Sequence, residues 1–197
     1  CLQGEKNSYC GKTVIIATGA APLPLHCPGE TEFLGKGVSY CATCDGAFFT
    51  GLDIYVVGGG DAAVEEALYL TRFGRKVTII HRRDQLRAAQ SIQQKAFANP
   101  NIHFLWNHVV KELSGDGLLQ RIVVENVQTK ECQEIIADEA DGLLGLFVFI
   151  GLKPNTKLFM KQLEMEQGYI KTDEKMHTNL PGVFAAGDVR IKSLRQV

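Results

Sequence analysis

The 197-residue sequence predicts a three-layer α/β fold with a parallel sheet and an antiparallel β-meander. A short apolar segment at 54–57 runs into a glycine-rich turn, and a helical pattern and a second apolar segment follow. In the middle of the chain, short strand-like segments are separated by turn residues, which is typical of a meander. An uninterrupted apolar segment then returns at 146–150, as expected of a central strand in a buried parallel sheet.

The remaining elements follow from the same patterns. A link containing Pro22, Pro24 and Pro28 predicts a domain boundary. The turn at 114–117 separates two strands of the meander, and Gly74 is expected to stop the first helix. We expect helices at 61–74 and 87–98, and strands at 13–17, 54–57, 77–80, 102–106, 109–113, 121–127, 134–137, 146–150 and 183–186.

Composition and charge exclude some classes of function. The formal net charge is −1, so no general attraction to nucleic acid or to an anionic membrane is expected. No apolar run approaches the length of a membrane span. Six cysteines in a chain of this length are not typical of a secreted disulfide scaffold, so a reducing cytoplasm is predicted.

The glycine-rich turn has the pattern G-x-G-x-x-A between a strand and a helix. Gly58 would allow the tight turn, Gly60 would let the backbone approach a pyrophosphate, and Ala63 would let helix and strand pack closely. The amides that open the helix at Asp61 and Ala62 would face the phosphates. The sequence therefore predicts a Rossmann-like dinucleotide-binding domain, with a plain structural turn as the alternative.

The second strand of this unit ends at His81 and is followed by a cluster of arginines. An NAD site would place an acidic residue near this point to accept hydrogen bonds from the ribose hydroxyls. Arg82, Arg83 and Arg87 are found instead, and guanidinium groups suit a 2′-phosphate. The cluster predicts NADPH in preference to NADH, and a solvated basic helix start is the alternative.

Cys41 and Cys44 form a C-x-x-C motif a few residues ahead of the glycine turn. A zinc site needs four ligands, but there is no second C-x-x-C, and only His103 and His108 have histidine-pair spacing. Two inert buried cysteines are a further alternative. A redox pair is favoured, because Asp45 follows directly and a carboxyl group can move the proton that thiol–disulfide exchange requires.

We therefore expect a reversible disulfide between Cys41 and Cys44. The other cysteines have no close neighbour in the sequence and are expected to stay unpaired. These are Cys1, Cys10, Cys27 and Cys132.

Taken together, these motifs resemble those of the low-molecular-weight, bacterial-type thioredoxin reductases. The resemblance rests on S-Y-C-A-T-C-D-G-A-F-F at 39–49, G-G-G-D-A-A-V-E-E-A-L-Y-L at 58–70, H-R-R-D-Q-L-R-A at 81–88 and G-V-F-A-A-G-D-V at 182–189. It also includes I-I-A-T-G-A at 15–20 and G-L-K-P-N-T at 151–156. The motifs cover nearly the whole chain in the order of that family.

The resemblance implies an NADPH domain inserted into an FAD domain. Residues 24–152 would form the NADPH-binding domain with the redox motif, and 1–23 and 153–197 would be partial FAD-domain segments. Cys41 would exchange with thioredoxin, Cys44 would face the flavin, and Asp45 would donate and accept the proton. The whole protein would be a cytoplasmic homodimer. Further cofactor-binding positions implied in this way are His81, Ile150, Gly151, Gly187, Asp188, Arg195, Gln196 and Val197.

The chain also departs from the pattern of that family. It lacks the first G-x-G-x-x-G, which holds the FAD pyrophosphate, so we expect it to bind FAD weakly or not at all. Flavin absorbance of the purified chain measures this. The resemblance therefore fits a fragment that does not turn over alone. The alternatives are an NADPH-binding module without catalysis, and a related flavin-dependent reductase of a peroxiredoxin or another dithiol.

Overall fold

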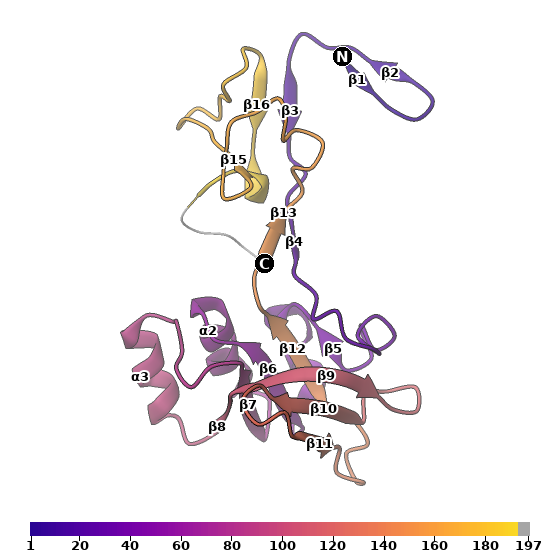
Figure 1. Ribbon diagram of the computed structural model, residues 1–197, viewed down its shortest axis with the longest axis vertical. Coiled ribbons are helices and arrows are strands. Elements are labelled where there is room, and N and C mark those ends of the chain that lie inside the picture. The colour runs from indigo at the N-terminus through magenta and orange to yellow at the C-terminus, as the bar shows by residue number, and fades with distance from the viewer. Residues whose placement is uncertain (193–197) are drawn as a thin grey trace. The chain divides into compact units, whose positions relative to one another are not determined.

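The computed structural model describes residues 1–192, and the chain divides into two compact units (Figure 1). One unit is Pro22–Gly151, and the other combines Cys1–Ala21 with the chain from Leu152 onward. These divisions lie within two residues of the boundaries expected from the sequence. The assignment of the units to particular cofactors remains a proposal.

The unit Pro22–Gly151 is built on a five-stranded parallel sheet. Its central strands are almost fully buried, and Val56 lies between Phe147 on one side and Ile79 on the other. Burial on both faces explains why these segments are apolar without alternation. The strands, in spatial order, are β5 (Val38–Ser39), β12 (Gly145–Phe149), β6 (Asp53–Gly58), β7 (Lys76–His81) and β8 (Ile102–Trp106).

Two further layers cover this sheet, as Figure 1 shows. On one face, α2 (Asp61–Leu70) and α3 (Gln90–Ala98) share a buried apolar cluster with β6 and β7. On the other face, the antiparallel strands of the meander share a second cluster with the sheet. The meander strands are β9 (His108–Ser114), β10 (Arg121–Asn126) and β11 (Cys132–Ile136). The predicted three-layer α/β fold is therefore confirmed.

A short helical segment carries the C-x-x-C motif into this unit. It consists of α1 (Ala42–Asp45) and a 3-10 turn, η1 (Gly46–Phe49). The ring of Phe49 packs edge-on against Phe147 of β12, with centroids 5.2 Å apart. This contact anchors the motif to the central sheet.

The second unit consists of short strands around a smaller core. In its parallel pair, β3 (Val14–Ile16) lies beside β16 (Val183–Ala185), which leads into η2 (Gly187–Val189). The buried residues include Ile16, Ile170 and Ala185. The other ladders are β1 (Leu2–Gln3) with β2 (Ser8–Tyr9), β4 (Ala20–Pro22) with β13 (Leu152–Pro154), and β14 (Met165–Glu166) with β15 (Tyr169–Ile170). The strands of these last three ladders were not expected from the sequence.

Two predicted helices are shorter than expected. The first ends at Leu70, and Gly74 is buried with ordinary negative φ, where a Cβ would lie 2.8 Å from Ile54. Gly74 therefore packs closely against Ile54 and does not act as a left-handed cap. The second helix begins at Gln90 and not at Arg87, because hydrogen bonds from the amides of residues 87–89 to Gly59 and Asp61 hold this segment outside the helix. Among residues 1–192, no helix is long and apolar enough to cross a membrane.

Candidate functional site: a redox disulfide and a nucleotide pocket

The expected disulfide between Cys41 and Cys44 is present, with their Cα atoms 5.3 Å apart. Cys41 occupies the N-cap position of α1, and its sulfur accepts a hydrogen bond of 3.2 Å from the amide of Cys44. Cys41 is half-buried, whereas Cys44 is exposed. In the reduced pair, the same amide would stabilise negative charge on the Cys41 sulfur.

A buried hydroxyl connects this motif to the neighbouring carboxylate. Ser39, at the end of β5, is only 3% exposed, and its hydroxyl lies 2.6 Å from Oδ2 of Asp45, to which it donates. The Ser39 hydroxyl oxygen also accepts a hydrogen bond of 3.0 Å from the amide of Cys41. Ser39 thus links the disulfide segment and the carboxylate, a role that no sequence motif indicated.

The expectation that the other four cysteines stay unpaired is wrong for two of them. Cys1 and Cys10 form a second disulfide across the β1–β2 hairpin. Antiparallel pairing brings residues together that are far apart along the chain, so sequence spacing did not reveal this bond. Cys27 and Cys132 are free thiols, and burial, with the nearby Glu30, raises the pKa of Cys27 to about 11.

Each glycine of the nucleotide turn has a different environment. Gly58 has a φ of 152°, and a Cβ there would lie 2.5 Å from the Cβ of Ala63 and from the Phe149 carbonyl oxygen. Gly59 packs against the His81 ring, a role that the motif did not predict. No atom lies within 4 Å of a Cβ built on Gly60, so this position leaves the space that a pyrophosphate needs.

Hydrogen bonds tie the segment after β7 to this turn. The Gly59 carbonyl accepts from the amides of Arg87 at 2.6 Å and Ala88 at 3.2 Å. Asp61, at the start of α2, accepts from the amide of Ala89 at 2.7 Å. These bonds hold Arg87 beside the glycine turn, although the two segments are almost thirty residues apart in sequence.

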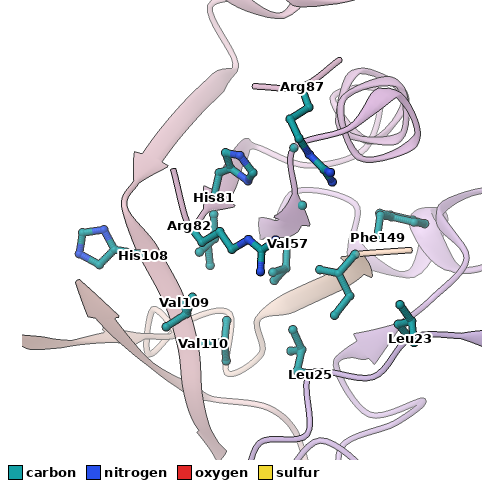
Figure 2. Close-up of a pocket in the computed structure, with 14 residues that line it drawn as sticks. Leu23, Leu25, Val57, His81, Arg82, Arg87, His108, Val109, Val110 and Phe149 are labelled. Carbon is teal, nitrogen blue, oxygen red and sulfur yellow. The ribbon is translucent and has the colours of Figure 1, made fainter. Parts of the chain in front are cut away.

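A pocket of about 470 Å³ opens beside the turn. Figure 2 shows the side chains of Arg82 and Arg87 directed into it, with apolar side chains below them in the view. Arg83 is exposed and does not line the pocket. The full lining is Leu23, Leu25, Val57, Gly58, Gly59, Ile80, His81, Arg82, Arg87, His108, Val109, Val110, Phe149 and Ile150.

His81 is the buried polar residue of this lining. It is 5% exposed, and its Nε2 has no hydrogen-bond partner among the described residues. Burial lowers its pKa, as do the nearby arginines, while a hydrogen bond with the backbone of Gln85 opposes this change. A neutral imidazole with an unsatisfied nitrogen is suited to meet a polar ligand group.

The comparison with known proteins agrees with this geometry. Residues 1–197 match the pyridine nucleotide-disulphide oxidoreductase family. The chain belongs to this family. It is 57% identical over 197 residues to a thioredoxin reductase of Peptoclostridium acidaminophilum, covering 100% of this chain and 62% of that protein.

Solved structures show the same similarity. The chain matches thioredoxin reductases of Lactococcus lactis (TM-score 0.81, 49% identity) and Streptococcus pyogenes (TM-score 0.82, 48% identity). In both cases the match covers 98% of this chain and 62% of the other. This pyridine nucleotide-disulphide oxidoreductase chain therefore spans less than two thirds of the length of these relatives.

The further cofactor-binding positions that the resemblance implies lie in different parts of this oxidoreductase chain. Asp188 of η2 forms an ion pair of 2.5 Å with Lys192, and Gly187 has a φ of 77°. Gly151, with a φ of 130°, accepts a hydrogen bond from the amide of Leu23. Three further positions, Arg195, Gln196 and Val197, lie outside the described residues.

The zinc interpretation of the C-x-x-C motif lacks support in residues 1–192. No group of three or more His, Cys, Asp or Glu side chains there could hold a metal ion. Cys41 and Cys44 are bonded to each other. The Nδ1 of His108 lies 2.6 Å from the Trp106 carbonyl oxygen, within hydrogen-bond distance. The pair therefore has the state required for disulfide chemistry.

Proposed function

We propose that the whole protein is an NADPH-dependent, FAD-containing thioredoxin reductase, and that this chain supplies its nucleotide pocket and its redox disulfide. One observation carries the proposal. The Cys41–Cys44 disulfide, with the Ser39–Asp45 pair beside it, belongs to the same compact unit as the arginine-lined pocket. A disulfide and a pyridine-nucleotide site in one unit serve electron transfer between them.

The pocket and the turn beside it fit NADPH in two respects. The space at Gly60 and the amides opening α2 suit a pyrophosphate. Arg82 and Arg87 suit the 2′-phosphate, because paired guanidinium groups bind a phosphate with charge-assisted hydrogen bonds. When bound, NADPH would supply a hydride, and FAD in the whole protein would supply the redox group between the nucleotide and the disulfide.

The residues of this chain then perform the thiol chemistry. Two electrons and two protons break the S–S bond, and Asp45 delivers one of the protons. The Cys41 thiolate, stabilised by the Cys44 amide, attacks the partner disulfide. A mixed disulfide forms and one partner sulfur leaves as a thiol. Cys44 then attacks Cys41, which releases the second partner thiol and restores the disulfide.

The proposal is tested in the whole protein by following NADPH oxidation with thioredoxin as the electron acceptor. We expect turnover in the wild type and none in Cys44→Ser, while reduction of the flavin by NADPH survives because the pocket is untouched. Turnover with a peroxiredoxin but not with thioredoxin would reassign the partner. Loss of flavin reduction in Cys44→Ser would contradict the separation of the two steps.

Two further properties of the whole protein are part of the proposal. A homodimer follows from the resemblance, and sedimentation of the whole protein measures it. A cytoplasmic location fits the free thiols Cys27 and Cys132, because reducing compartments preserve such groups. Fractionation of cells that express the whole protein measures that location.

A further inference from the structure

Glu30 is the only buried carboxylate among residues 1–192, and its side chain is 6% exposed. It accepts hydrogen bonds from the amide of Leu25 at 2.7 Å, from the amide of His26 at 2.8 Å and from the Tyr40 hydroxyl. Both oxygens are used, because Leu25 donates to Oε1 and His26 donates to Oε2. Burial and the hydrogen bond to Glu30 raise the pKa of Tyr40, so this hydroxyl keeps its proton and remains a donor.

The turn that carries Glu30 is fixed against the meander. Gly29 has a φ of 86°, and a Cβ there would lie 2.1 Å from the carbonyl oxygen of Leu113 in β9. The amide of Leu113 also donates to the Pro28 carbonyl at 3.0 Å. This close approach of two backbones leaves no room for a side chain at position 29. Glu30 therefore reaches its partners from a rigid support.

The segment that Glu30 holds forms one wall of the nucleotide pocket. Leu25 lines the pocket together with Leu23, whose amide donates to the Gly151 carbonyl at 2.9 Å. His26 has a φ of 60°, a left-handed conformation that residues other than glycine adopt only with support from their surroundings. The hydrogen bond from the His26 amide to Glu30 supplies such support. The position of the Leu25 side chain therefore depends on Glu30.

The pocket has a basic end and an apolar end. Figure 2 shows Arg87 and Leu25 at opposite ends of it. Arg82 follows β7 and Phe149 ends β12, and these two strands lie on opposite sides of β6. A dinucleotide crosses such a sheet where the strand order reverses, with its pyrophosphate at the first glycine turn. With the adenosine half at the arginines, the nicotinamide half would lie at the apolar end.

We propose that Glu30 is a positioning residue for the nicotinamide half of NADPH, because it fixes the backbone that places Leu25 against the ring. This inference rests on the proposed function, since it takes NADPH to be the ligand of the pocket. Glu30 itself does not line the pocket. Its third donor, Tyr40, directly precedes Cys41, so the same carboxylate ties the pocket wall to the redox segment.

The experiment compares NADPH with adenosine 2′,5′-bisphosphate, which has the 2′-phosphate but no nicotinamide. Isothermal titration calorimetry measures the binding of each to the 197-residue chain and its variants. Glu30→Gln places an NH₂ group where a backbone amide needs an acceptor. It is therefore expected to weaken NADPH binding by roughly fivefold or more, and to leave bisphosphate binding within about twofold. Glu32→Gln, an exposed glutamate in the same turn, is the matched control and should change neither affinity.

Two further variants test how Glu30 acts. Leu25→Ala should give the same selective loss of NADPH affinity, roughly tenfold, and Glu30→Gln should add little to it. Tyr40→Phe removes one of the three donors and keeps the aromatic ring, so it should cause a smaller loss that is also selective for NADPH. Circular dichroism establishes that each variant is folded.

The inference is overturned if Glu30→Gln weakens the binding of both nucleotides equally or changes neither. It is also overturned if the losses from Glu30→Gln and Leu25→Ala simply add, because Glu30 would then not act through Leu25. If Glu30→Gln does not fold, an unchanged ratio of the two affinities in Tyr40→Phe overturns it. A wild-type chain that binds neither nucleotide would refute the proposed function together with this inference, so the two failures are distinguishable.

Discussion

Replacing Ser39 with alanine is expected to slow the redox chemistry of Cys41–Cys44 without unfolding the domain. The substitution removes a hydroxyl that donates to Asp45 at 2.6 Å and accepts from the Cys41 amide at 3.0 Å. A hydrogen bond to a charged group contributes about 1.5–3 kcal/mol. If this energy positions Asp45 for proton transfer, its loss slows exchange by roughly ten- to hundredfold.

The assay is reduction of the Cys41–Cys44 disulfide by dithiothreitol, stopped by acid and alkylation at successive times. Thr43→Ala is the matched control, because Thr43 is an exposed residue in the same segment whose hydroxyl lies 3.4 Å from the Cys41 sulfur. A change of less than about twofold is expected for the control. Circular dichroism of Ser39→Ala establishes that any loss of rate does not come from unfolding.

A double-mutant cycle separates positioning from general structural support. If Ser39 acts through Asp45, the rate loss caused by Ser39→Ala should be much smaller in the Asp45→Ala background. Equal losses in both backgrounds would refute this reasoning, since Ser39 would then act through the Cys41 amide or the fold. An unchanged rate in the single variant would refute it outright.

Four other predictions follow from the glycine turn and the pocket beside it. Arg82→Ala combined with Arg87→Ala should weaken NADPH binding by roughly tenfold or more in a titration, while affinity for NADH, which lacks the 2′-phosphate, stays unchanged. Gly58→Ala should lower the free energy of unfolding by about 1–3 kcal/mol in urea, because its Cβ meets backbone at a φ of 152°. Gly60→Ala should leave stability nearly unchanged and still weaken nucleotide binding, because its Cβ enters open space. Burial lowers the pKa of His81 in the folded state. The stability that its neutral form contributes is therefore fully present above about pH 6.5 and is lost as the pH falls toward the folded-state pKa. His81→Gln should flatten this part of the pH dependence of the free energy of unfolding in urea.

Contiguous motifs predicted those parts of the fold and the site that depend on neighbours in sequence. The strand, turn and helix around Gly58 follow from local periodicity, and the Cys41–Cys44 disulfide follows from a spacing of three residues. The start of α3 did not follow, because the amide of Ala89 is satisfied by Asp61, which lies 28 residues earlier in the chain. Local propensity cannot report a hydrogen bond that tertiary structure supplies.

The two disulfides show the same limit on what local sequence can predict. Cys41 and Cys44 are adjacent on a single turn, so their approach needs no knowledge of the fold. Cys1 and Cys10 meet only because β1 and β2 pair in one register, and a slip of one residue would place them on opposite faces of the hairpin. Short, exposed strands leave almost no hydrophobic pattern from which that register could be predicted.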